Sequence, residues 1–307
     1  GRCQSGSETI MLSDRTNHSD SPPPPDNPHA GGIIPQVTPP LPRESPHARQ
    51  LPANMAFTWL KHGWSDFLTH PSLSLFYGIL VFAVSALVVW GLFQFRYEYA
   101  LFPALAGFVL LGPLIAVGLY EKSRRIEANE RITMGGMLFA RPASKHQALF
   151  MGVLLLGLFL LWQRAAVLIY ALFFGLVDFP GTDELVPMLL FTPTGWALLV
   201  TGGAIGALFA AFSFAISVFA VPMLLTERTD ALSAMGISMA MVWANLPVML
   251  VWGGIVVVLT VLSLATGFLA LVVVFPVLGH ATWHAYRTVR PDERQQGESE
   301  RMFVRPA

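Results

Sequence analysis

The chain has 307 residues, of which 54% are hydrophobic and only 12% are charged, and its 19 basic residues balance its 19 acidic residues. This composition excludes an ordinary soluble domain, and the zero net charge gives no indication of nucleic-acid binding. The one cysteine, Cys3, excludes a disulfide framework and a cysteine-ligated zinc or iron–sulfur site. The sequence therefore favours a protein embedded in a membrane.

Residues 1–54 contain eleven prolines and few aromatic residues. We expect a disordered tail there, because such a composition buries too little apolar surface to offset chain entropy. No cleaved signal peptide is expected, and Met11 and Met55 are both candidate natural starts. Residues 291–307 are expected to form a disordered charged tail, which leaves residues 55–290 as the membrane domain.

Residues 55–70 have the spacing of an amphipathic helix that lies in the membrane interface. The apolar residues of its face are Phe57, Leu60, Trp64, Phe67 and Leu68, and the residues away from that face are Lys61, His62 and Asp66. Residues 132–139 and 227–245 are two further amphipathic stretches, for which we expect the same position.

The stretch from Leu246 to Tyr286 holds 41 residues and no Asp, Glu, Lys or Arg. As one helix it would be about 60 Å long, roughly twice the thickness of the hydrocarbon core of a bilayer. Two helices that turn at Ala265-Thr266-Gly267 fit better, since glycine permits the backbone angles that end helices. The other expected spans cover residues 72–95, 99–120, 147–174 and 194–225.

The predicted fold class is therefore all-α: a polytopic membrane protein whose six transmembrane helices form three hairpins, with amphipathic helices in the cytoplasmic interface. Six Lys or Arg residues lie between residues 121 and 145 and five Arg residues follow residue 286, whereas the opposite side holds only Arg96. The positive-inside rule thus predicts that both termini are cytoplasmic. The second helix of each hairpin holds a proline, Pro113, Pro222 or Pro276, that should kink or break it.

Five segments together resemble a family of bacterial integral membrane proteins called domain of unknown function 2189. They read GWSDFLTHP, GPLIAVGLYEKSRR, LWQRAA, FAISVFAVPMLL and FPVLGHATWHAYR, and the resemblance covers about residues 56–290. It implies a multi-pass protein of the bacterial inner membrane, and it implies no mechanism because the family has no established activity. Some members carry the label cytochrome c oxidase subunit I, which implies more spans and more in-membrane histidines than this sequence holds.

Arg164 lies inside an expected span, about ten residues from its non-cytoplasmic end. A charge there costs a few kcal/mol on insertion scales, so it needs a partner or water. Three hypotheses follow: the side chain snorkels to the near interface, it pairs with Asp178, Asp183 or Glu184, or it contacts a substrate or lipid phosphate.

His280 and His284 lie one helical turn apart on the same face, where they could present two imidazoles to one metal. Haem would need a ligand from another helix, and zinc or copper at least one more donor. Hydrogen bonding to a neighbouring helix is the favoured interpretation, and no cofactor or metal is predicted. Gly202, Gly206 and Ala210 form a small-residue stripe, for which packing within the chain is favoured over a homodimer.

The sequence contains no P-loop, no Rossmann glycine fingerprint, no Ser-His-Asp spacing and no HExxH motif. We predict a non-enzymatic inner-membrane protein, either a scaffold or an accessory subunit, whose partners are the lipid bilayer and other membrane-protein subunits but not nucleic acid. One alternative is a transporter or lipid-binding protein that uses the kinked helices and Arg164. A further alternative is a haem or copper protein that uses His280 and His284.

Overall fold

The computed structural model describes residues 47–97, 100–175 and 182–290, and within these ranges every extended regular element is a helix. The expected all-α fold is confirmed for this part of the chain. The two expected tails fall almost entirely outside the described residues, since only residues 47–54 of the first are included.

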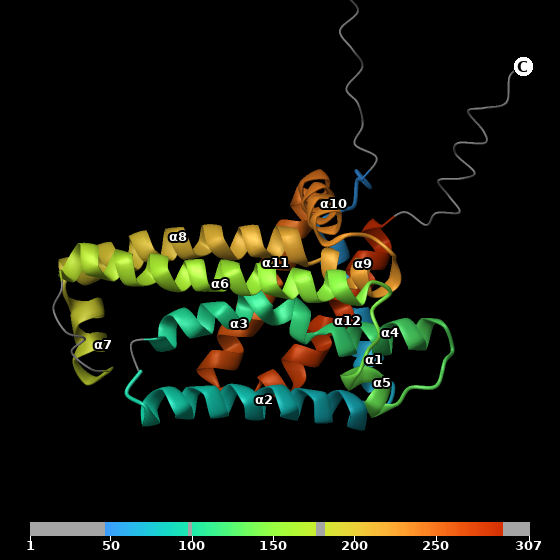
Figure 1. Cartoon of the computed structure of the whole chain (residues 1–307), viewed down its shortest axis with the longest axis horizontal. Helices are drawn as coiled ribbons and strands as arrows, with labels where there is room; N and C mark the ends of the chain where they lie inside the picture. Colours follow the sequence, from blue (N-terminus) through green and yellow to red (C-terminus); the bar gives the residue numbers. More distant parts are fainter. Residues whose placement is uncertain (1–46, 98–99, 176–181, 291–307) are drawn as a thin grey trace, which may run out of the picture. The chain divides into compact units, whose positions relative to one another are not determined.

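The helices are labelled in chain order in Figure 1. Their bounds are α1 (Met55–Leu68), α2 (Pro71–Gln94), α3 (Leu101–Ile115), α4 (Val117–Glu127), α5 (Met134–Leu138), α6 (Lys145–Phe174), α7 (Thr182–Phe191), α8 (Pro193–Ser217), α9 (Ala220–Thr226), α10 (Ala231–Ala244), α11 (Leu246–Ala265) and α12 (Leu271–Val289).

Among the described residues, four helical segments are long and apolar enough to cross a membrane. They are α2, α6, α11 and the continuous stretch Pro193–Thr226, which comprises α8 and α9. The second expected span is shorter than predicted, because α3 ends at Ile115 and spans only about 22 Å. The sixth corresponds to α12, whose second half carries two histidines and Arg287 and is therefore too polar to qualify by composition alone.

The three prolines have different local settings. Pro113 lies two residues before the end of α3, and Pro222 lies in the first turn of α9, where its missing N–H costs little. Pro276 lies inside α12, and the helix continues without a break from Leu271 to Val289.

The turn predicted between the last two apolar helices is confirmed. Helix α11 ends at Ala265, and Gly267 has a positive φ of 60°. The N–H of Phe268 donates to the carbonyl of Ser263 at 2.7 Å, which closes the end of the helix. Glycine supplies the left-handed conformation at low cost, as the sequence indicates.

Helix α12 is the best-buried long helix, and it packs on α1, α2 and α4. Two glycines allow the close approach. A Cβ atom on Gly63 of α1 would lie 2.6 Å from the Val277 carbonyl oxygen, and one on Gly78 of α2 would lie 2.0 Å from the Val272 carbonyl oxygen. Both contacts are with the backbone of α12, so a side chain at either glycine would force the helices apart.

Helices α6 and α8 run side by side in Figure 1 and pack against each other. The small-residue stripe contributes to this contact: a Cβ on Gly206 would lie 2.9 Å from the Trp162 ring, and one on Gly202 would face Ile169. The first expected hairpin differs, because α2 packs chiefly on α12 whereas α3 packs on α6 and α8. An apolar cavity of about 390 Å³ lies between α2 and α3.

The three stretches predicted to be amphipathic contain α1, α5 and α10, and each lies beside or carries exposed aromatic residues. The prediction is wrong for α10, which is apolar on all of its faces. On α1, Phe57 and Trp64 of the predicted apolar face are exposed, whereas Phe67 of the same face is buried. Of the residues expected on the other face, Lys61 and His62 are exposed but Asp66 is buried. Phe139 directly follows α5 and is exposed. Trp243, the residue before the last of α10, is also exposed.

Candidate functional site

Helix α4 carries polar side chains on two of its faces, and each face contributes to a different polar feature of the structure. One of its faces carries Lys122 and Ser123, is buried against α12, and is joined to α1 and α2 by hydrogen bonds of Lys122. We call this set the polar junction; its members are the buried residues Asp66, Ser74, Lys122, Ser123 and His280 and the partly buried His284. The other face of α4 carries Glu121, Arg124 and Arg125 and borders a cavity.

Lys122 is fully buried at the centre of the polar junction. Its ammonium group donates to Ser74 Oγ at 2.7 Å and to the carbonyl oxygens of Asp66 at 3.0 Å and His70 at 3.4 Å. The Asp66 carbonyl lies in the last turn of α1, where helical carbonyls lack intrahelical partners and where a positive charge is favourable. The His70 carbonyl belongs to the residue before the first turn of α2 and also accepts from the Leu73 N–H at 3.2 Å. Burial lowers the pKa of Lys122 to about 8, against an opposing effect of the Asp66 charge.

His280 is also fully buried, and both of its ring nitrogens have hydrogen-bond partners. Nε2 lies 3.0 Å from Ser74 Oγ, and Nδ1 lies 2.9 Å from Ser123 Oγ. Whichever tautomer is present, the N–H and the lone pair of the imidazole are both used. His280 therefore joins α2, α4 and α12, and it has no free nitrogen for a metal or haem iron.

His284 pairs with Asp66, with Nε2 at 2.9 Å from Oδ2. Burial alone would raise the pKa of Asp66, but hydrogen bonds from His284 and Ser123 outweigh it and lower the pKa. The carboxylate is therefore ionised beside the Lys122 ammonium group. Among the described residues, no three His, Cys, Asp or Glu side chains converge as a metal site needs.

The sequence interpretation misplaced two members of the polar junction. Asp66 was expected on the polar face of an interfacial helix, and Lys122 was counted only as one of the six basic residues of a cytoplasmic connection, yet both are buried. Ser74 and Ser123 gave no signal of their own. The available signal was the set of motifs, because GWSDFLTHP, GLYEKSRR and GHATWHAYR, which carry the family resemblance, meet in space here.

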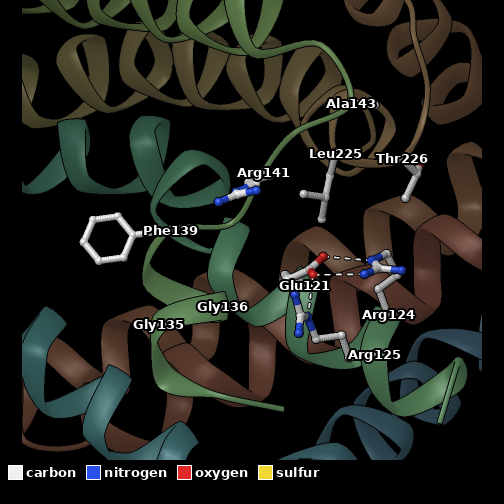
Figure 2. Close-up of a pocket in the computed structure, with 10 residues that line it drawn as sticks. All are labelled: Glu121, Arg124, Arg125, Gly135, Gly136, Phe139, Arg141, Ala143, Leu225 and Thr226. Carbon is white, nitrogen blue, oxygen red and sulfur yellow. Dashed lines mark hydrogen bonds and ion pairs between the residues drawn. The ribbon is translucent and has the colours of Figure 1, made fainter. Parts of the chain in front are cut away.

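The cavity on the other face of α4 has a volume of about 680 Å³. We call it the arginine pocket, and Figure 2 shows the ten residues that line it. They are Glu121, Arg124 and Arg125 from α4, Gly135, Gly136, Phe139, Arg141 and Ala143 from α5 and the segment after it, and Leu225 and Thr226 from the end of α9.

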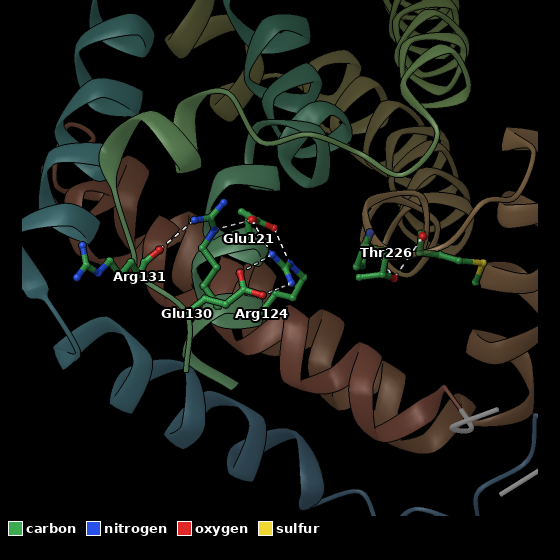
Figure 3. A network of polar contacts seen from close by, with 8 residues as sticks. Glu121, Arg124, Glu130, Arg131 and Thr226 are labelled. Atoms are coloured by element: carbon green, nitrogen blue, oxygen red, sulfur yellow. Dashed lines mark hydrogen bonds and ion pairs between the residues drawn. The ribbon is translucent and has the colours of Figure 1, made fainter. Parts of the chain in front are cut away.

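Most of the charge in the arginine pocket is paired. Glu121 accepts hydrogen bonds from Arg124 at 2.8 and 3.0 Å and from Arg125 at 2.6 Å, and Arg124 also reaches Glu130 at 3.1 Å (Figure 3). Burial would raise the pKa of Glu121, but these two guanidinium groups outweigh it and lower the pKa. Within the described residues, Arg141 has no recorded ion pair or hydrogen bond, so the lining carries a net positive charge.

Arg164 belongs to neither polar feature. It is exposed on α6, as are its neighbours Leu160, Leu161 and Leu168. Of its three expected acidic partners, Asp178 and the Asp183 side chain lie outside the described residues. Glu184 is exposed, and no ion pair between it and Arg164 is recorded in the described part of the chain.

Residues 101–226 match the model of a family described as "Predicted integral membrane protein (DUF2189)". No curated protein and no solved structure matches the chain. The matched region contains the helices from α3 to α9, and so includes Lys122 and all ten residues that line the arginine pocket. The family match and the four long apolar helices together identify the chain as an integral membrane protein.

Proposed function

We propose that the chain crosses the bacterial inner membrane six times as three hairpins, with both termini in the cytoplasm and α1, α5 and α10 in the cytoplasmic interface. The hydrogen bonds between helix ends support this topology. His280, at the middle of α12 and followed by the helix's polar C-terminal half, contacts Ser74 at the start of the first span and Ser123 just after the second. Six crossings require these three ends to lie on the same side.

Hydrogen bonds also join the ends of the third and fourth spans and the ends of the fifth and sixth spans. The Ala143 N–H, just before the third span, donates to the Leu225 carbonyl at the end of the fourth at 3.1 Å. Asn245, just before the fifth span, accepts from the Arg49 N–H, and Arg49 Nε donates to the carbonyl of Val289 at the end of the sixth.

Labelling of single cysteines tests this topology. In a Cys3→Ser background, Thr266→Cys should react with a membrane-impermeant maleimide in intact cells, because Thr266 lies in the expected outer turn. Asn129→Cys, between α4 and α5, should react only after the inner membrane is permeabilised. Labelling of Asn129→Cys in intact cells, or protection of Thr266→Cys there, contradicts the proposed orientation.

We propose further that the protein is non-enzymatic and acts as an accessory subunit or scaffold of a larger membrane assembly. The observation that supports this role is the exposed position of Arg164. It lies ten residues before the end of α6, about 15 Å along the helix, among exposed leucines. Lipid chains offer no counter-charge, so a carboxylate on another membrane chain is a partner of suitable chemistry.

The test is the size of the assembly purified in mild detergent from cells that express the gene at its natural level. The wild-type chain should migrate well above its own mass of 33.6 kDa on native gels. Arg164→Leu should migrate as the isolated chain with an unchanged melting temperature, and Arg164→Lys should retain the assembly in part. Migration of the wild type alone, or an intact assembly in Arg164→Leu, contradicts the proposal.

A further inference from the structure

The arginine pocket lies where two membrane-crossing helices end. Thr226 in its wall is the last residue of the candidate span Pro193–Thr226, and Lys145, two residues after Ala143 in the wall, is the first residue of the candidate span formed by α6. The hydrogen bond from Ala143 to Leu225 holds these two ends at the same level. The polar headgroups of a bilayer begin at the level where its spanning helices end.

The chemistry of the pocket suits an anion. Glu121 is saturated by Arg124 and Arg125, and Arg124 is shared with Glu130. Arg141 is exposed on the opposite wall, and no acidic partner is recorded for it among the described residues (Figure 2). A guanidinium group binds phosphate oxygens through two parallel hydrogen bonds, which makes arginine well suited to this ligand.

The remaining walls fit the rest of a lipid molecule. Phe139 is 79% exposed, and Leu225 lines the same cavity, so an apolar edge adjoins the charged lining. A Cβ on Gly135 would meet nothing within 4 Å, so this wall leaves open space. The volume of about 680 Å³ falls within the usual range for small-molecule sites and is sufficient for a headgroup with its glycerol.

We propose that the arginine pocket binds the phosphate of an anionic phospholipid headgroup, with Arg141 as its principal ligand and Arg124 and Arg125 as supporting cations. This site is independent of the assembly role proposed for Arg164, which lies elsewhere on the chain. Binding should weaken with added salt, because it depends on the attraction between a phosphate and arginine side chains.

The experiment titrates the purified full-length protein in detergent with short-chain phosphatidylglycerol and follows binding by calorimetry. Arg141→Gln should weaken binding by about tenfold or more, as expected for the loss of a charge-assisted contact. The matched control is Arg131→Gln, because the Arg131 side chain is exposed and does not line the cavity. Its affinity should equal that of the wild type, and the melting temperature of both variants should be unchanged because both side chains are exposed.

Two further titrations identify the source of the phosphate. Phosphatidylcholine of the same chain length should bind much more weakly, because its choline cation is repelled by the pocket. Inorganic phosphate should also bind weakly, because it lacks the glycerol and acyl groups. Equal binding by wild type and Arg141→Gln, or equal affinity for the two lipids, overturns the proposed site. Inorganic phosphate that binds as tightly as phosphatidylglycerol overturns its assignment to a lipid.

Discussion

Replacement of Lys122 by methionine should lower the free energy of unfolding by about 3–5 kcal/mol, the cost typical of removing one partner from a buried charged network. The substitution removes the Lys122 donor from Ser74 Oγ and from the carbonyl oxygens of Asp66 and His70; His70 keeps the Leu73 N–H and Ser74 keeps His280 as a second partner. It also leaves the Asp66 carboxylate buried with less positive charge nearby. Unfolding in mixed micelles titrated with SDS measures the change. The control is Lys61→Met, since Lys61 is exposed on α1 and its loss should change stability little.

The pH dependence of stability gives a second test of the same lysine. The pKa of Lys122 is lowered from 10.5 to about 8 by burial, so between these values the unfolded chain binds more protons than the folded chain. The contribution of Lys122 to the free energy of unfolding therefore increases with pH across this window. Comparison with Lys122→Met separates this contribution from those of the other titrating groups. Lys122→Met should lack this rise. A variant with the same pH profile as the wild type, or with unchanged stability, shows that Lys122 is not buried as described.

Substitution of Gly78 by alanine should give the second largest effect, a loss of about 1–3 kcal/mol or more. The new Cβ would lie 2.0 Å from the carbonyl oxygen of Val272, a backbone atom of α12 that cannot move by a rotamer change. Helices α2 and α12 would have to separate, which also stretches the hydrogen bond between Ser74 and His280. SDS unfolding measures the loss.

The matched control for this substitution is Gly91→Ala on the same helix. A Cβ on Gly91 would meet nothing within 4 Å, so the added methyl group costs no packing. Alanine also favours helices by up to about 1 kcal/mol over glycine, so the control should be neutral or slightly stabilising. Equal effects of the two substitutions would mean that α2 and α12 do not approach each other at Gly78.

Features that depend on chain length and local pattern were predictable from the sequence. The uncharged stretch from Leu246 to Tyr286 is too long for one crossing, and Gly267 marks the turn that the structure contains. The helical spacing of residues 55–70 likewise predicted the helix α1, but it predicted the faces only in part, because Phe67 of the apolar face and Asp66 of the polar face are both buried. Such features follow from helix geometry and need no knowledge of tertiary contacts.

The polar junction could not be predicted in the same way. Lys122 stands in the sequence Glu-Lys-Ser-Arg-Arg, where the local density of charge indicates exposure. The packing of α12 on α4 buries this face, and the position of α12 depends on glycines far away in the chain. Asp66 illustrates the same point, because its partner His284 is 218 residues away.

The arginine pocket was missed for a related reason. Its lining joins Glu121, Arg141 and Leu225, which come from three separate segments, so no contiguous motif describes it. The sequence did predict, through the positive-inside rule, that the basic residues between 121 and 145 lie on the cytoplasmic side. Which arginine is left unpaired depends on the side-chain contacts of Glu121 and Glu130, and only the structure supplies these.

The most direct test of the polar junction is a double-mutant cycle between Ser74 and Lys122, whose side chains are joined by a hydrogen bond of 2.7 Å. The cycle compares the unfolding free energies of Ser74→Ala, Lys122→Met and the double variant. Because the shared hydrogen bond can be lost only once, the double variant should be more stable than the sum of the single effects predicts, by about 1 kcal/mol or more. If the two single effects add to within about 0.5 kcal/mol, Ser74 and Lys122 do not interact, and the polar junction does not join α2 to α4.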